Sequence, residues 1–326
     1  MFVMNSEKKP RSKLARFVSN HALLIGFFVI IIFFSLATNN FWSKANLLLL
    51  LRQACVVGIA ACAMTYVFIA GNMDLSVGAL ITLSVLISVD LHDKIGPLPS
   101  ILLAIACCIV IGIINGFIVG YLKVHSMIVT LGMMMILRGV MLLYTGGQLT
   151  WVDNPNETWF SIFGRGTVLG IPFPAIMLFV FVIIFELVLK KTTFGIKVQA
   201  TGGNPNAVKY SGIDDRKIVL ITFIFSALMS AIAGLVMGSR TMKFQIEIAF
   251  GHEFSAISAV ILGGTSLSGG FGSVYKTLIG VLIMASLYNG FLMLGLPYYF
   301  QWIVQGVVIL IMVGFDVLTK KKEGSL

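Results

Sequence analysis

Gly71–Gly78 is the first segment whose residue types could do chemistry, because it puts a carboxyl group and a hydroxyl group inside an apolar stretch. The carboxyl group belongs to Asp74 and the hydroxyl group to Ser76. Either can accept hydrogen bonds from the free N–H groups at the start of a following helix, whose positive end also suits a carboxylate. An ionisable side chain here can instead form part of a substrate or gating route. The sequence favours the capping role and leaves the route open.

A second segment, Gly263–Gly270, repeats this pattern late in the chain. Both segments read G-x-x-[DS]-L-S-x-G, and the second adds the hydroxyl groups of Thr265, Ser266 and Ser268. Transporters are often built from internal repeats, and glycine-interrupted segments at matching places of two halves point to the binding site. We therefore expect the two segments to occupy corresponding places. The alternative is a chance likeness between two turns rich in glycine and serine.

The longest hydrophilic loop, 190–217, contains a predicted short helix over 204–212. Asn204 suits the N-cap, Pro205 suits the first helical position and Gly212 suits the position just after the helix. A capped helix is unusual in a simple linker, so we expect it to dock on a cytoplasmic partner. The alternative is a helix that lies on the lipid surface, for which its apolar face is short.

Motifs for catalysis or cofactor binding do not occur in the sequence. It has no G-x-x-x-x-G-K-[ST] phosphate loop, and Gly269–Gly272 has no βαβ context. The four histidines are isolated, whereas a metal site needs several donors within reach. The cysteines lie in apolar stretches and are expected to be small core residues: Cys55, Cys62, Cys107 and Cys108. We predict no catalytic residue, no cofactor site and no metal site in this chain.

Membrane-spanning helices must position these segments. The 326 residues are 58% hydrophobic and 11% charged, whereas soluble domains are about 25% charged. The apolar stretches do not alternate as in a β-barrel, and several approach the roughly 20 residues that a spanning helix needs. We predict an all-α polytopic bundle with ten spans, at about 22–39, 52–70, 75–92, 98–121, 126–146, 170–189, 217–239, 253–268, 274–294 and 299–318.

The distribution of positive charge predicts the orientation of this bundle. With both ends in the cytoplasm, 16 of the 23 Lys and Arg residues lie on the inner side, as the positive-inside rule requires. The same rule explains the net charge of +10 without a nucleic-acid partner. We expect basic cytoplasmic tails at 1–20 and 319–326 around a transmembrane domain at 21–318. A cleaved signal peptide is the less favoured reading of the N-terminus, because its apolar run is long.

The three segments belong to a longer series of motifs. The others are I-V-T-L-G from Ile128 to Gly132, T-x-F-G from Thr192 to Gly195, G-G-N-x-x-A-x-x-S-G-I from Gly202 to Ile213, and E-x-x-A-I-x-A-V ahead of the second segment, from Glu253. From about Asn46 to Asp316 the chain resembles the permease subunits of ribose-type bacterial ABC sugar importers. Two residues depart from the family pattern, namely Ile196, where a basic residue is usual, and Phe271, where small or basic residues are common.

The resemblance implies a transport subunit of the bacterial cytoplasmic (inner) membrane that is not itself an enzyme. Its implied partners are a second permease copy or a paralogue, a cytoplasmic ATP-binding subunit with two fused cassettes, an extracytoplasmic sugar-binding protein, and membrane lipid. ATP and magnesium would bind to the partner ATPase, with no cofactor in this chain. The residues implied to couple to the ATPase are Gly202, Gly203, Asn204, Ala207, Ser211 and Gly212.

The resemblance also implies alternating access, with a monosaccharide, a pentose or a hexose, passing along the seam between two copies. Hydroxyl and amide groups suit such a solute, so the candidate path residues are Asp74, Ser76, Asn115, Thr130, Thr265, Ser266 and Asn289. Arg138 and Glu253 are further ionisable candidates for the path, and a structural ion pair or an interfacial position is the alternative. The alternatives are another solute, such as a nucleoside or a signalling sugar, a self-sufficient secondary transporter, and a sensor or scaffold.

Overall fold

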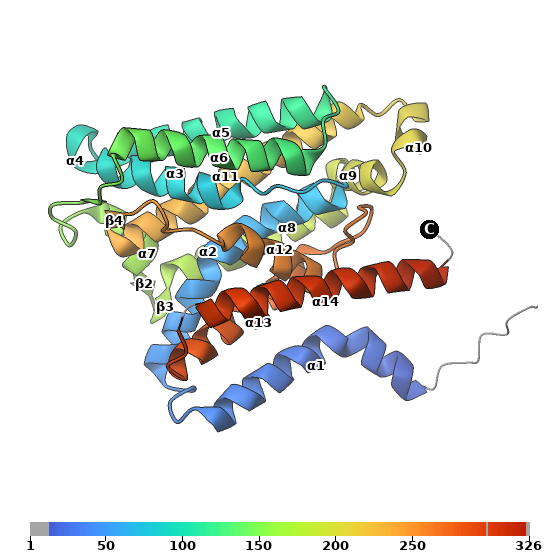
Figure 1. The fold of residues 1–326 in the computed structure, drawn as a ribbon, viewed down its shortest axis with the longest axis horizontal. Helices are drawn as coiled ribbons and strands as arrows, with labels where there is room; N and C mark the ends of the chain where they lie inside the picture. The colour runs from blue at the N-terminus through green and yellow to red at the C-terminus, as the bar shows by residue number, and fades with distance from the viewer. Residues whose placement is uncertain (1–12, 298, 324–326) are drawn as a thin grey trace, which may run out of the picture.

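The computed structural model describes the backbone of residues 13–297 and 299–323 and the side chains of residues 23–297 and 299–311. The expected basic tails at 1–20 and 319–326 lie outside the residues whose side chains are described. The structure is a bundle of α-helices (Figure 1), as the sequence predicted. It adds two small antiparallel sheets, one pairing Thr150–Trp151 (β1) with Lys243–Phe244 (β4), the other pairing Thr167–Val168 (β2) with Ile171–Pro172 (β3).

The helices follow one another with short connections. The N-terminal half contains α1 (Lys13–Ala37), α2 (Lys44–Ile69), α3 (Val77–Asp90), α4 (His92–Ile95), α5 (Pro97–Gly120) and α6 (Ser126–Thr145). A 3-10 turn, η1 (Trp159–Ser161), and α7 (Ile162–Arg165) precede α8 (Phe173–Lys191), α9 (Thr193–Gly203) and α10 (Pro205–Tyr210). The C-terminal part contains α11 (Asp215–Thr241), α12 (His252–Leu262), α13 (Val274–Met293) and α14 (Tyr299–Glu323).

Six of the described helices are long and apolar enough to cross a membrane: α2, α5, α6, α8, α11 and α13. The other four predicted spans coincide with shorter apolar helices, at Leu23–Ala37, Val77–Asp90, His252–Leu262 and Tyr299–Ile311. The prediction of a helical membrane bundle is therefore confirmed.

The structure differs from the sequence-based expectation at two places. The span expected at 253–268 ends as a helix at Leu262, because Gly264, just after the C-cap residue Gly263, adopts a positive φ angle of 77° that ends helical geometry. The loop expected at 190–217 contains a second helix, α9, which the sequence did not predict. Thr192 caps α9 by accepting a hydrogen bond from the N–H of Gly195.

The middle of the bundle is held by close contact between α5 and α11. Gly112, Gly116 and Gly120 face α11 at intervals of four residues. A Cβ atom at Gly112 would lie 2.6 Å from the Cβ of Ala227, and one at Gly120 would lie 2.8 Å from the carbonyl oxygen of Arg216. Small residues spaced in this way let the backbones of membrane helices approach each other closely.

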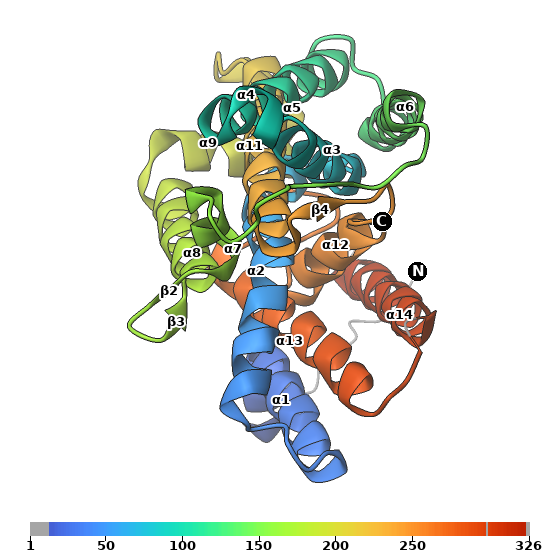
Figure 2. The ribbon, with the colours of Figure 1, turned by 90° about the vertical axis from the view of Figure 1, so that its left-hand side faces the viewer.

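The two ends of the bundle differ. One end, called the α10 end below, carries α9 and α10, and the opposite end, the β4 end, carries α4, α7 and β4 (Figure 1). Viewed at a right angle, α8 and α14 lie on opposite sides of α2 (Figure 2). In the same view α6 and α14 border one face, with α12 between them. This arrangement sets a frame for placing the polar residues.

Candidate functional site

Asp74 lies in the non-helical segment between α2 and α3 and organises a buried network. Its Oδ1 accepts hydrogen bonds from the N–H and the hydroxyl of Ser76, at 2.9 and 2.6 Å. Its Oδ2 accepts one from the hydroxyl of Ser226 on α11, at 2.7 Å, and Asn115 on α5 donates to the Ser76 hydroxyl at 3.1 Å. Asp74 thus accepts a hydrogen bond from the backbone N–H of Ser76 at the start of α3, which agrees with the predicted capping role. The Ser76 side chain makes no such cap.

Thr130 joins this cluster from α6. Its hydroxyl oxygen accepts the N–H of Leu75 at 3.1 Å, and the hydroxyl oxygen of Ser126 accepts the N–H of Met73 at 3.1 Å. In lipid, backbone groups outside a helix need such partners from the protein itself. Four of the seven predicted path residues therefore lie together: Asp74, Ser76, Asn115 and Thr130. They form hydrogen bonds with the backbone of the non-helical segment between α2 and α3 or with one another.

The other three predicted path residues lie elsewhere. Asn289 on α13 and Asn46 on α2 exchange two amide hydrogen bonds, of 3.0 and 2.8 Å, and both are buried. Thr265 is buried and its hydroxyl has no hydrogen-bond partner among the described residues. Ser266 is half-buried and accepts the N–H of Ser268 at 3.2 Å.

Five glycines from three segments meet backbone to backbone at the α10 end; we call Gly71, Gly202, Gly203, Gly269 and Gly270 the glycine junction. The N–H of Gly270 donates to the carbonyl of Ile69, the last residue of α2, at 2.8 Å. A Cβ atom at Gly202 would lie only 1.8 Å from that carbonyl oxygen. One at Gly269 would lie 2.9 Å from the Cα atoms of Gly71 and Gly202. The two repeated segments therefore touch each other and the end of α9.

α10 has the caps that the sequence predicted. The Asn204 side chain accepts the N–H of Ala207 at 3.0 Å, Pro205 begins the helix, and Gly212 follows it with φ of 72°. Only Val208 in this helix is buried, whereas Tyr210 is 93% exposed. α10 thus presents nearly its whole surface outward from the bundle.

Arg138 and Glu253 form an ion pair between α6 and α12. Nη2 of Arg138 lies 3.1 Å from Oε1 of Glu253, and its guanidinium lies 4.7 Å from the ring centroid of Phe250. Glu253 is 1% exposed, and a Cβ at Gly78 would lie 2.0 Å from its Oε2, so only glycine leaves room for the carboxylate. The ion pair, one of the possibilities that the sequence left open, is therefore present.

A hydrogen-bonded group at the β4 end ties the long connection after α6 to the bundle. The ring of His92 contacts Oδ1 of Asp93 at 2.6 Å and the hydroxyl of Thr158 at 2.8 Å. Oδ2 of Asp93 accepts the N–H of Asp153 at 2.9 Å. Burial disfavours the charged form of Asp93, but the hydrogen bonds from Asp153 and His92 outweigh it and lower the pKa of Asp93.

A cavity of about 270 Å³ lies near the β4 end, between α2, α11, α12, α13 and α14. The polar groups in its lining come from five places in the sequence: Gln53, Arg240, His252, Ser255, Tyr288, Trp302 and Gln305. None of the seven predicted path residues lines it.

The sequence reasoning missed this lining, although one signal was available. Arg240 is one of the seven basic residues that the predicted orientation leaves on the outer side, near the end of an apolar stretch. Lys94 and Arg138, also in that group, pair with acids, whereas Arg240 has no ion pair among the described residues. An unexplained basic residue close to a span is a reason to look for a polar site.

Comparison with known families gives this arrangement a context. Residues 46–313 match the family described as branched-chain amino acid transport system / permease component. The chain belongs to this family. It is a transport permease rather than an enzyme, and a multi-pass protein of the inner membrane.

Individual relatives match over nearly their whole length. The ribose import permease protein of Bacillus subtilis (strain 168) is 40% identical over 293 residues, covering 90% of this chain and 91% of the relative. The xylose transport system permease protein of Haemophilus influenzae is 34% identical, with 93% and 97% covered. An L-arabinose ABC transporter permease protein of Azospirillum brasilense is 30% identical, with 98% and 93% covered. The resemblance to ribose-type importer permeases is confirmed. No solved structure matches the chain.

Proposed function

We propose that this chain is the permease subunit of an ATP-driven importer that carries a monosaccharide, a pentose or a hexose, across the inner membrane by alternating access. The observation that carries the proposal is the set of relatives named for ribose, xylose and arabinose, which match over at least 90% of this chain. The buried polar network at the break between α2 and α3 and the exposed α10 support the same function.

We further propose that the α10 end faces the cytoplasm and that the chain crosses the membrane ten times. A cytoplasmic ATPase, with two fused cassettes, would then dock on α10, and its movement would reach α2 and α12 through the glycine junction. Support comes from the exposure of α10 and from the lysines around it, Lys190, Lys191, Lys197, Lys209 and Lys217. An extracytoplasmic sugar-binding protein would dock at the β4 end.

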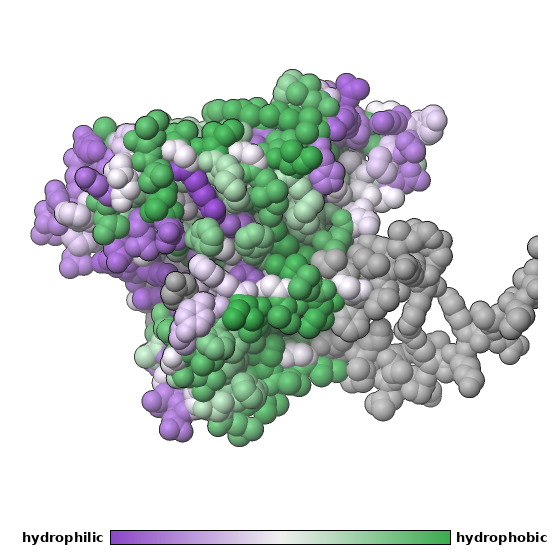
Figure 3. All heavy atoms as spheres, viewed as in Figure 1, coloured by the Kyte–Doolittle hydropathy of each residue, from purple (hydrophilic) through white to green (hydrophobic). Residues whose placement is uncertain are grey.

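A second copy would pack on the face bordered by α6 and α14. Hydrophobic residues cover most of this face, with hydrophilic residues among them (Figure 3). The side chain of Arg138 is 26% exposed there, halfway along α6. A charged side chain at such a depth is costly against lipid, so this face needs protein or water beside it. The path candidates Asp74, Ser76, Asn115, Thr130, Thr265, Ser266 and Asn289 would then respond to helix movement rather than touch the sugar in this state.

Transport by the complete importer in proteoliposomes tests the function. ATP-dependent uptake of D-ribose or D-xylose is expected, with none of L-leucine. Ala207→Trp on α10 should abolish assembly with the ATPase and uptake together, whereas Leu169→Trp, a 98% exposed residue at the β4 end, should leave both unchanged. Uptake that persists without the ATPase would refute the proposal and favour a secondary transporter. Uptake of leucine or a nucleoside alone would refute the choice of solute.

Cross-linking tests the proposed seam. In a variant without the four native cysteines, Ile303→Cys on α14 should form a cross-linked dimer in the membrane. Ile183→Cys on α8 is the matched control, because the two residues are 58% and 57% exposed and their helices lie on opposite sides of α2 (Figure 2). Cross-linking at Ile183 instead of Ile303 would place the seam elsewhere.

A further inference from the structure

We propose that the cavity near the β4 end is a binding site for one monosaccharide inside each copy of the chain, opening on the seam and recognising hydroxyl groups rather than charge. The proposal rests on the proposed function and adds the place and the chemistry of recognition. A volume of about 270 Å³ is close to the lower limit of about 300 Å³ for pockets that hold small molecules. The cavity therefore has room for a small solute such as one sugar ring.

The polar lining offers a ligand both hydrogen-bond donors and hydrogen-bond acceptors. Oε1 of Gln53 is buried without a hydrogen-bond partner among the described residues, and it can only accept. The guanidinium of Arg240 can only donate, and it lies close enough to the charge of Arg52 for the two to repel each other. Each buried group left unpaired costs free energy. Sugar hydroxyls both donate and accept, so one polyol can serve Gln53 and Arg240 together.

The side-chain amide of Gln305 is held in one orientation beside the cavity. Nε2 of Gln305 on α14 donates to the hydroxyl of Ser255 at 2.9 Å and to the carbonyl of Gly251 at 3.3 Å. These bonds hold the Gln305 side chain, which is 7% exposed, against the start of α12. The Gln305 carbonyl and the Ser255 hydroxyl thereby keep set positions beside the cavity, as selective recognition requires.

Aromatic rings line the same cavity. The rings of Phe250 and Trp302 lie with centroids 5.5 Å apart, and Tyr288 lies on α13. All three are partly exposed, by 45%, 45% and 40%, whereas Val56 deeper in the cavity is 2% exposed. The rings therefore border the opening. Their flat faces suit the C–H groups of a sugar, and the hydroxyl group of Tyr288 suits its hydroxyls.

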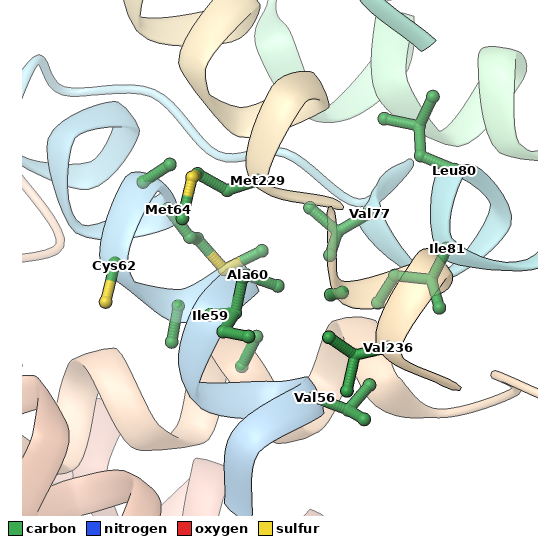
Figure 4. Packing of buried hydrophobic residues seen from close by; sticks show 14 of the residues in the cluster. Val56, Ile59, Ala60, Cys62, Met64, Val77, Leu80, Ile81, Met229 and Val236 are labelled. Carbon is green, nitrogen blue, oxygen red and sulfur yellow. The ribbon is translucent and has the colours of Figure 1, made fainter. Parts of the chain in front are cut away.

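The opposite wall of the cavity is closed by the core. Val56 lines the cavity and packs in the same cluster as Ile59, Ala60 and Val236 (Figure 4). These four side chains are at most 2% exposed. A sugar in the cavity could not continue toward the α10 end unless α2 and α11 moved apart. A site that is closed on one side is what alternating access requires of one state.

The charge of the lining discriminates between solute classes. Among the described residues, no carboxylate lines the cavity, and the nearby Glu253 is engaged by Arg138. An amino acid would bury its ammonium group here without a negative partner, which costs several kcal/mol. A neutral sugar has no such cost. The cavity therefore favours sugars over the amino acids named in the family description.

Fluorescence of Trp302 in the full-length protein, reconstituted in lipid nanodiscs, tests this site. Trp42, Trp151 and Trp159 are replaced by Phe, and D-ribose, D-xylose and L-leucine are added in turn. A saturable change of emission is expected with a sugar and none with leucine. Gln305→Leu should weaken sugar binding about tenfold, the effect of losing one or two hydrogen bonds.

Gln301→Leu is the matched control, because Gln301 lies on the same helix, is equally buried at 7% exposed, and is not part of the cavity lining. It should leave sugar binding unchanged. If neither sugar changes the emission while the complete importer still takes up that sugar, the site is refuted and the proposed function stands. If leucine binds as well as sugar, or if both glutamine variants weaken binding equally, recognition by this lining is refuted.

Discussion

Replacing Gly202 by alanine should separate ATP hydrolysis from transport. The added Cβ would lie 1.8 Å from the carbonyl oxygen of Ile69 and 2.6 Å from the backbone nitrogen of Gly270. Ordinary contacts begin at about 3.5 Å, so α9 would have to move away from α2 by roughly 1.7 Å. All the groups concerned belong to the backbone, and no side chain can rotate away. The hydrogen bond from Gly270 to Ile69 would also break.

The cost follows from these contacts. Overpacking of this kind costs about 1–3 kcal/mol, and the lost hydrogen bond adds about 1 kcal/mol. This free-energy cost is large relative to the stability of the local junction and small relative to the stability of the whole bundle. The variant is therefore expected to fold and to bind the ATPase through α10, while the movement of α10 no longer reaches both repeated segments. Sugar uptake should fall at least tenfold, with ATP hydrolysis retained.

Gly203→Ala provides the control. A Cβ at Gly203 would lie 3.5 Å from the Cα of Gly270, an ordinary contact, so its coupling should stay near normal. The measurement is the number of sugars taken up for each ATP hydrolysed, in proteoliposomes with the complete importer. Normal coupling in Gly202→Ala at normal expression would show that the glycine junction does not transmit the movement. Equal loss in both variants would show that the close contact at Gly202 is not the cause of the loss.

Three other predictions follow from contacts of named side chains. Arg138→Gln should lower the free energy of unfolding by about 3–5 kcal/mol, because it leaves the charge of Glu253 buried and unpaired, and Arg138→Gln with Glu253→Gln should recover most of it in a thermal unfolding assay. If the double variant recovers none of the lost free energy of unfolding, this interpretation is wrong. Asn204→Ala removes the cap of α10 and should cost about 1 kcal/mol, measured as weaker binding of the ATPase, whereas Asn204→Asp should retain it. Asn289→Leu should destabilise the protein by about 1–3 kcal/mol, because Oδ1 of Asn46 loses its partner, and Asn46→Leu in addition should cost only the remaining hydrogen bond to the carbonyl of Phe41, about 1 kcal/mol, as chemical denaturation in detergent would measure.

Features fixed by neighbouring residues were predictable from the sequence. The caps of α10 depend on Asn204, Pro205 and Gly212, which lie within nine residues, and the structure confirms each. The end of α12 also had a local signal, because Gly263 and Gly264 directly follow Leu262. The predicted span nevertheless continued to Ser268, through residues that the structure places in a turn against other segments.

The candidate site shows the same division. Residue types singled out four side chains that the structure brings together: Asp74, Ser76, Asn115 and Thr130. Ser226, which also binds Asp74, is 152 residues away from it and gave no local signal. The cavity was missed because its lining combines Gln53, Arg240 and Gln305, which only the packing of α2, α11 and α14 brings together. Predicting such a site needs the tertiary contacts, since each residue alone suits an ordinary position near a helix end.

The shortness of α12 has a consequence for how the protein enters the membrane. Eleven residues at 1.5 Å each make a helix of about 16 Å, roughly half of the 30 Å hydrocarbon core. Such a segment cannot cross the core alone, so the polar backbone groups at one of its ends lie at a depth where only protein can satisfy them. α12 is therefore expected to insert together with α13 as a hairpin, and to reach its final depth only when α2 and α9 supply the contacts around Gly269 and Gly270. The N-terminal repeat must already be in place when the C-terminal one arrives, so the order of synthesis along the chain is also the order of assembly.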